Sequence, residues 1–309
     1  KSSQVMPKLA HTYYQLGRIY CLLGDYERSI PAFQTFSDLR PKNPLANLEL
    51  GFALLQVCPP NGKCADGLNS YDVWRRAGVT PEHFQEMAER ERQRENYAEA
   101  LLWYQQAQRM GRELRSTIAY IRYLLFKAKG DEERALQALQ SAVEMDEGWL
   151  REEFKIWAMN DYGFSIYYSQ YDCIKASKIF SKVVNLTYNN CEKYPFQASS
   201  AHFHIGLCLY INNQYQEALG SFSKALECGS NYSWMQIWYA KALYMVDPNN
   251  KKSATEHFIR GLELSNDKVD YWKEVLSFWG EHDEKNLLSD FCNLAKTKNI
   301  IELQDVCNK

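Results

Sequence analysis

The chain has 309 residues, of which 46% are hydrophobic and 24% are charged, and its formal net charge is −2. This composition predicts a folded chain with a sizeable buried core and excludes a Pro/Gly-rich disordered one. Acidic and basic residues nearly balance, so neither nucleic acid nor an anionic membrane is expected as the principal partner. No apolar run is long enough to span a membrane, so no membrane span is expected within this chain.

The first pattern is a pair of short helices between about residues 10 and 43. The first helix carries Gly17, and the second carries Ser29 and Phe33 at the matching positions. Helical neighbours lie three and four residues apart, so small residues at these positions allow two antiparallel helices to pack closely around a ring. The Gly-Asp pair at residues 24–25 marks the turn between the two helices.

The second and third units follow with two differences. The second begins near residue 44 with Gly51 on its first helix, but residues 58–67 form a loop insertion before its second helix. The third begins with Thr80 as the expected N-cap and Pro81 in the first helical position. Its first helix has a charged stripe of Glu82, Gln85, Glu89 and Arg92. A solvated helix face is the expected reading of this stripe, and recognition of a charged partner is the alternative.

Four more units repeat the spacing. The fourth has Tyr123 in place of the glycine, the fifth has Gly163 but one residue more than the pattern before its second helix, and the sixth, residues 199–232, is the most regular. We expect the second helices to be buried at these positions: Ser29, Phe33 and Phe36; Ala100, Tyr104 and Ala107; Ala135, Leu139 and Ala142; Ala176, Phe180 and Val183; Ala218, Phe222 and Ala225; Ala254, Phe258 and Gly261.

After residue 267 the pattern stops. Residues 268–309 are expected to form two or three amphipathic helices that cover the last apolar face of the stack. We therefore predict two regions, a stack of about seven hairpins at 1–267 and a helical cap at 268–309. No domain boundary is expected inside the stack, and its weakest joints are expected at the 58–67 insertion and in the fourth unit.

The pattern resembles the tetratricopeptide repeat, a unit of about 34 residues whose signature includes Leu-Gly, Tyr, Ala and Phe. Leu16, Gly17, Tyr20 and Phe33 match it in the first unit. The resemblance implies an all-α, right-handed α-solenoid whose inner wall is made by the first helix of each hairpin. It also implies a non-catalytic scaffold that binds a protein or peptide segment.

Carried onto the fifth to seventh hairpins, the inner-wall positions of the family predict an aromatic binding surface, because aromatic side chains are the usual anchors of such surfaces. The predicted members are Trp157, Asn160, Phe164, Tyr167, Tyr168, Phe203, Tyr210, Trp234, Lys241 and Tyr244, with Leu207, Ile211, Ile237 and Met245 at the remaining positions. The alternative is that these side chains pack between neighbouring repeats.

The nine cysteines are expected to be free, buried or half-buried thiols, since a chain of this length does not need disulfide bonds to stabilise its fold. One pair differs. Cys58 and Cys64 flank a turn-rich loop, so a local disulfide is possible in an oxidising compartment. No metal site is expected, because His83 completes no ligand set and His202 and His204 lie two apart, on different sides of a helix.

No enzyme motif occurs in the sequence, and neither an enzyme nor a cofactor is predicted. Residues 74–107 resemble repeat tails of bacterial membrane proteins that assemble surface polysaccharide. That second resemblance implies an extracytoplasmic domain that binds glycan or partner proteins, with the cysteines at 58 and 64 oxidised. The compartment and the oligomeric state stay open, as does a longer, membrane-anchored protein upstream of Lys1.

Overall fold

The computed structural model describes residues 2–41, 43, 49–51, 53, 54, 57, 80–187, 191–229, 232–266, 268–298, 300, 303 and 307. Within these residues the regular structure is helical throughout, which confirms the predicted all-α class. The chain divides into two compact units, Lys1–Leu150 and Arg151–Lys309, and each is described by itself. No helix in the described ranges is long and apolar enough to cross a membrane.

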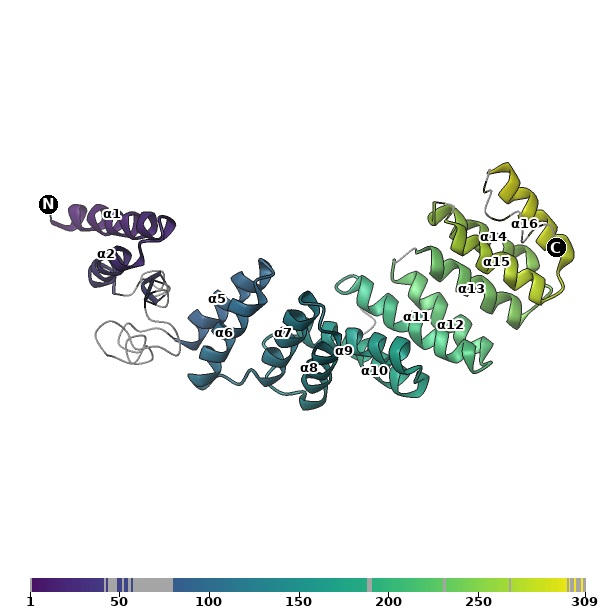
Figure 1. Ribbon diagram of the computed structural model, residues 1–309, viewed down its shortest axis with the longest axis horizontal. Helices are drawn as coiled ribbons and strands as arrows, with labels where there is room; N and C mark the ends of the chain where they lie inside the picture. Colours follow the sequence, from purple (N-terminus) through teal and green to yellow (C-terminus); the bar gives the residue numbers. More distant parts are fainter. Residues whose placement is uncertain are drawn as a thin grey trace. The chain divides into compact units, whose positions relative to one another are not determined.

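The first unit contains three described hairpins, α1/α2, α5/α6 and α7/α8, and α6 also packs on α7 (Figure 1). Their bounds are α1 Ser2–Leu22, α2 Tyr26–Leu39, α5 Pro81–Gln93, α6 Tyr97–Arg109, α7 Arg115–Ala128 and α8 Glu132–Met145. The predicted second hairpin and the 58–67 insertion lie almost wholly outside the described residues. Leu50 and Ala53 are described, and both are buried in one core with Phe33 of α2 and Phe84 of α5.

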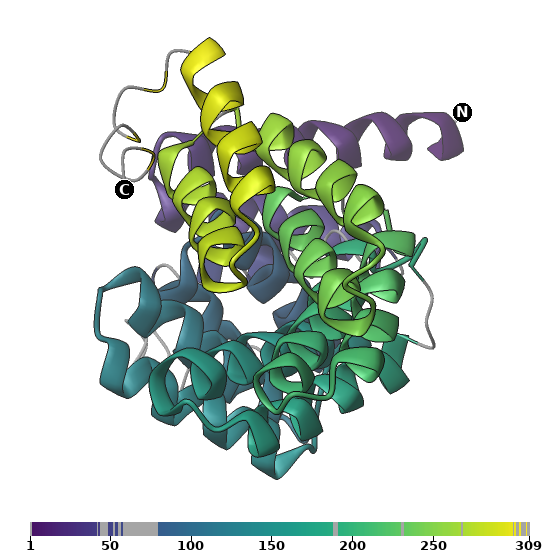
Figure 2. The ribbon, with the colours of Figure 1, turned by 90° about the vertical axis from the view of Figure 1, so that its right-hand side faces the viewer.

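The second unit contains four hairpins, α9/α10, α11/α12, α13/α14 and α15/α16, of which Figure 2 gives a second view. Their bounds are α9 Glu152–Ser165, η1 Ile166–Gln170, α10 Cys173–Thr187, α11 Pro195–Ile211, α12 Tyr215–Glu227, α13 Ser233–Val246, α14 Lys251–Leu264, α15 Val269–Glu281 and α16 Lys285–Thr297. Each helix packs on the next one, and the first helices also contact one another in the order α9, α11, α13, α15. This arrangement is the predicted solenoid of helical hairpins.

The hairpin turns show why the sequence breaks where it does. Outside the α13/α14 turn, which contains Pro248, each described hairpin turn has a residue in the left-handed region, such as Gly24 with φ +74° and Asn213 with φ 60°. In three hairpins an aspartate follows and caps the second helix: the Asp25, Asp131 and Asp172 carboxylates each accept a hydrogen bond, at 2.9–3.2 Å, from a backbone N–H three residues on. Thr80 and Pro81 begin α5 as predicted.

The second-helix positions predicted to be buried are buried in all six hairpins. The glycines of the first helices lie against the rings of the second. A Cβ placed on Gly17, Gly163 or Gly206 would stand 2.6–2.7 Å from the facing phenylalanine ring. In α7 the same position holds Tyr123, and the second helix then carries the smaller Leu139, which is fully buried. In the fourth hairpin the larger residue at the glycine position is therefore matched by a smaller residue at the phenylalanine position.

The last two helices, α15 and α16, form a further hairpin that packs on α14. Trp272 and Trp279 of α15 and Phe291 of α16 share one buried core with Phe258 of α14. The division of the chain at residue 267 stays a prediction. The boundary between the two compact units falls instead after α8, at the end of the fourth hairpin, although the sequence predicted no domain boundary inside the stack.

The cysteines correct the sequence expectation. Cys191 is bonded to Cys228 and Cys292 to Cys307, so the prediction of free thiols is wrong for these four. Cys191 precedes α11 and Cys228 caps α12, and antiparallel pairing brings these two ends of the hairpin together, with 4.7 Å between the Cα atoms. The predicted pair Cys58 and Cys64 lies outside the described residues.

Candidate functional site

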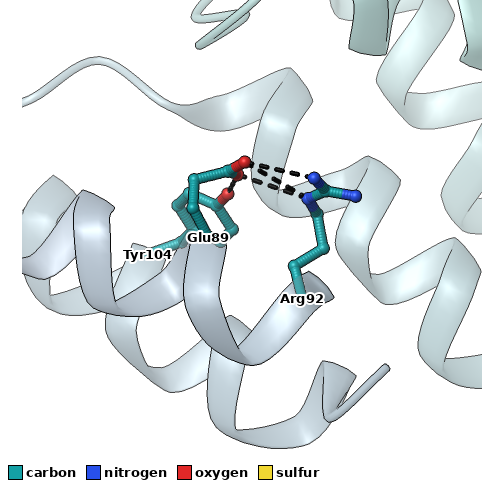
Figure 3. A network of polar contacts seen from close by, with 3 residues as sticks. All are labelled: Glu89, Arg92 and Tyr104. Atoms are coloured by element: carbon teal, nitrogen blue, oxygen red, sulfur yellow. Dashed lines mark hydrogen bonds and ion pairs between the residues drawn. The ribbon is translucent and has the colours of Figure 1, made fainter. Parts of the chain in front are cut away.

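The charged stripe of α5 is partly buried, which corrects its reading as a solvated face. Glu89 is 7% exposed because α6 covers it. Figure 3 shows its carboxylate between two donors, the hydroxyl of Tyr104 and the guanidinium of Arg92, whose nearest nitrogen lies 3.2 Å away. Gln85 is also buried. Glu89, held by these two donors, therefore stabilises the third hairpin.

The predicted aromatic surface is partly assembled in the second unit around one residue that the sequence did not assign to it. The ring of His204, on α11, contacts Phe164 at 4.5 Å, Tyr167 at 5.5 Å and Phe203 at 5.2 Å between ring centroids. These edge-on arrangements are favourable for aromatic pairs. Rings from α9, η1 and α11 therefore form one cluster centred on an imidazole.

His204 is held in one neutral tautomer. Its Nδ1 donates to the carbonyl oxygen of Ser200 at 2.8 Å, and its Nε2 accepts from the hydroxyl of Tyr168 at 3.4 Å. Burial lowers the pKa of His204 to about 4. His204 therefore lies in the centre of the cluster as a neutral, hydrogen-bonded ring.

The π-helix η1 explains the extra residue that the sequence shows in the fifth hairpin. One added residue between Gly163 and Ala176 is accommodated as a π turn, which is how a helix absorbs a single insertion. The turn carries Tyr167 and Tyr168, and Tyr171 follows it with φ 53°, in the left-handed region. Tyr168 is 57% exposed and Tyr171 86% exposed, so this end of the cluster faces solvent.

The cluster continues to α13. Phe203 contacts Trp234 with 4.0 Å between ring centroids, and Trp234 in turn stacks on Tyr232 at 5.6 Å. Phe196 contacts Tyr232 at the outer edge, where both rings are exposed. The predicted members Phe164, Tyr167, Tyr168, Phe203 and Trp234 are therefore brought together, whereas Trp157 packs on Phe154 of its own helix.

A small cavity of about 250 Å³ opens between the first helices α13 and α15. Trp234 and Trp238, one turn apart on α13, line one side. Tyr271 lines the other side with the carboxylates of Asp270 and Glu274. Sequence reasoning missed all of these except Trp234 and the lining residue Ile237. Two features of the sequence could have indicated this cavity: the four-residue spacing of the tryptophans, and the Asp-Tyr pair at the start of the next first helix.

Two further predicted residues lie beside this cavity. The buried ammonium of Lys241 forms an ion pair with Glu274 and lies 4.4 Å from the centroid of the Trp238 ring. Tyr210 contacts Trp238 edge-on, with 5.2 Å between ring centroids. Asp270 has no ion-pair partner among the described residues, so the rim carries a net negative charge.

Four predicted residues are buried: Asn160, Phe203, Lys241 and Tyr244. The hydroxyl of Tyr244 donates to Glu284 at 2.8 Å, and burial together with that carboxylate raises the pKa of Tyr244 to about 12. These four can support a binding surface but offer little area to a partner. The binding role of the whole predicted set stays a prediction.

The antiparallel hairpins, which pack on one another within each unit, define a helical-repeat protein of the kind that serves as an interaction scaffold. Residues 10–43 match the tetratricopeptide repeat. The same small-residue and ring positions recur in the later hairpins. The first hairpin therefore matches a tetratricopeptide repeat, and the later hairpins repeat its packing pattern.

Several solved structures are similar to the chain at low identity. MamA from Desulfovibrio magneticus RS-1, residues 41 to the end, is 15% identical with a TM-score of 0.46, covering 62% of this chain and 97% of that one. PilF of Pseudomonas aeruginosa is 14% identical with a TM-score of 0.44, covering 88% and 99%. The APC/C hetero-tetramer Cut9–Hcn1 is 14% identical with a TM-score of 0.44, covering 100% and 56%. No curated protein sequence matches the chain.

Proposed function

We propose that the chain is a non-catalytic scaffold whose second unit binds an extended protein segment across the first helices α9 to α15. The observation that carries this proposal is the aromatic cavity between α13 and α15. At about 250 Å³ it is smaller than the roughly 300–1,000 Å³ of typical small-molecule sites, and it suits one side chain of a segment. The flat rings of Trp234 and Tyr271 supply the contact area.

The charges around the cavity indicate which segment fits. Lys241 pairs with Glu274, whereas Asp270 has no ion-pair partner among the described residues, so the rim attracts a cation. A lysine or arginine next to an apolar anchor residue could pair with Asp270 and lie over an aromatic ring. The exposed Tyr168 and Tyr171 supply further contact area near the other end of the first-helix row.

Panning a random peptide library on the full chain tests the proposal. We expect enriched peptides that combine an apolar residue with a neighbouring lysine or arginine. Asp270→Asn combined with Tyr271→Ala should weaken their binding by about tenfold or more, since anchors of this kind dominate binding energy. Ile174→Ala on α10, which removes an exposed apolar side chain from a second helix, is the matched control and should bind normally. Equal binding by all three proteins would overturn the proposal.

A second candidate function is an extracytoplasmic domain that binds glycan or partner proteins of envelope assembly. The two disulfides favour it, because structural disulfides persist mainly in oxidising compartments. In this case the exposed rings would stack on sugars. A glycan array probed with the full chain and with the variant Asp270→Asn/Tyr271→Ala distinguishes the two candidates. Glycan binding that the variant loses supports this candidate, and a blank array supports the peptide scaffold.

A further inference from the structure

The first unit has a groove of its own, far larger than the aromatic cavity of the second. It lies between α6, α7 and α8 and has a volume of about 940 Å³. Four arginines line it, Arg109 from α6, Arg115 and Arg122 from α7, and Arg134 from α8. Its described lining residues include no aspartate or glutamate. A chain with a net charge of −2 therefore concentrates positive charge in one groove.

Two of these arginines hold no ion pair with any described residue, namely Arg109 and Arg122. Arg115 pairs with Glu113 at 3.1 Å and with Glu147 at 3.5 Å. Arg134 pairs with Asp131 at the start of its own helix. Because these pairs lie at the surface, each contributes little to stability, and an incoming carboxylate can replace it at small cost.

The rest of the groove suits a polypeptide. Ala119 on α7 and Ala138 on α8 leave room for a backbone, and the nearby amides of Gln105 and Gln137 can both donate and accept hydrogen bonds. The guanidinium of Arg134 lies over the ring of Phe126, 4.9 Å from its centroid, which holds that charge at the groove. A ligand that alternates carboxylates with apolar side chains would engage all of these groups.

We propose that this groove binds an acidic protein segment whose carboxylates pair with Arg109 and Arg122 and whose backbone lies over Ala119. Arginine suits this role, since its planar guanidinium can hold a carboxylate through two parallel hydrogen bonds. Two second helices, α6 and α8, line this groove together with α7, whereas the first helices α13 and α15 line the aromatic cavity. The groove does not depend on the function proposed for the second unit, whose cavity has the opposite charge.

Fluorescence anisotropy with the full chain tests the proposal. The probe is a labelled peptide rich in glutamate and leucine, compared with the same peptide carrying glutamine for glutamate. We expect binding of the glutamate peptide that weakens with added salt, and at least about tenfold weaker binding by the variant Arg109→Gln/Arg122→Gln. Circular dichroism and thermal unfolding establish that the variant is folded.

The matched control is Lys252→Gln/Arg260→Gln, which removes two positive charges from exposed positions on α14. It should bind the peptide as the unchanged chain does. A charge-reversed chain, Arg109→Glu/Arg122→Glu, should prefer a lysine-rich peptide. The proposal is overturned by equal binding of the glutamate peptide to both double glutamine variants. It is also overturned if a single-stranded oligonucleotide competes more strongly than the peptide, which would assign the groove to nucleic acid.

Discussion

Gly206 on α11 lies directly against the ring of Phe222 on α12. A Cβ at position 206 would stand 2.6 Å from the ring atoms Cδ1 and Cε1, which is closer than real side chains approach. The same contact joins Gly17 to Phe33 and Gly163 to Phe180. In these hairpins the two helices therefore approach so closely that only glycine fits opposite the ring.

The first prediction concerns this contact. Gly206→Ala should lower the free energy of unfolding by about 1–3 kcal/mol, because an overpacked core forces the Phe222 ring out of place. Gly220→Ala is the control: it lies in α12 with open space around it and should raise stability by about 0.5–1 kcal/mol. Urea unfolding measures both. Gly206→Ala/Phe222→Leu should recover part of the loss, and equal effects at positions 206 and 220 would contradict the packing account.

The second prediction concerns the buried carboxylate of the third hairpin. Tyr104→Phe removes a hydroxyl that donates to Glu89 and should lower the free energy of unfolding by about 1–3 kcal/mol. Tyr171→Phe removes a hydroxyl from a side chain that is 86% exposed and should change stability little. Thermal unfolding compares the two. If Tyr104→Phe is as stable as the control, the hydroxyl contributes nothing to holding Glu89.

The third prediction is a pH dependence from His204. Its folded pKa is about 4, below the ordinary value of 6.5, so the unfolded state binds more protons between these values. The stability contributed by the neutral ring is therefore fully present above about pH 6.5 and is lost as the pH falls to about 4, by at most about 3 kcal/mol.

The measurement is the free energy of unfolding as a function of pH for the unchanged chain and for His204→Gln. Burial also lowers the pKa of His202 and His257, so a residual slope is expected in the variant, smaller than in the unchanged chain. His11→Gln, at an exposed position on α1, should leave the slope as it is. A variant slope at position 204 equal to that of the unchanged chain would contradict the assignment.

The fourth prediction concerns the disulfides. In chain produced in an oxidising compartment, denaturation without reductant should expose at most five thiols of the nine cysteines, and three if Cys58 and Cys64 are also bonded. Cys292→Ser/Cys307→Ser opens a loop of 15 residues and should lower stability by up to about 3 kcal/mol. Nine reactive thiols before reduction would contradict both the pairing and the extracytoplasmic candidate function.

The fifth prediction separates stability from binding at Tyr171. This residue adopts a left-handed conformation that favours glycine, yet its side chain is solvent-exposed. Tyr171→Gly should raise stability by about 1 kcal/mol and weaken binding of library-selected peptides. Glu95→Gly, at the matching turn of the third hairpin, should raise stability similarly and leave binding unchanged. Unchanged binding by Tyr171→Gly would remove this tyrosine from the proposed surface.

Much of the fold could be predicted because its determinants are local. The spacing of Gly206, Ala218 and Phe222 defines one hairpin without reference to the rest of the chain, and the same spacing predicts its neighbours. The pairing of Cys191 with Cys228 was not predicted, although both ends of an antiparallel hairpin must meet. Sequence distance concealed that relationship, since 37 residues separate the two cysteines.

The candidate site was predicted less well, because its exposure depends on how one hairpin covers the next. Asn160 and Lys241 occupy wall positions but are buried by neighbouring helices. Tyr271 was missed because residues after 267 were treated as a cap, whereas α15 continues the row of first helices and completes the cavity. Glu89 was misread for the same reason, since the helix that covers it comes from later in the sequence.

The π-helix at Ile166–Gln170 has a consequence for how the later repeats keep their alignment. In a periodic helix, one inserted residue puts every following side chain about 100° out of phase. Here the wider turn absorbs that shift within five residues, and Ala176 and Phe180 return to the phase of the other hairpins. Deleting a single residue of the turn after the buried Ile166 would leave Ala176 and Phe180 in phase and re-orient Tyr167 and Tyr168. The exposed rings can thus be re-aimed independently of the fold that carries them.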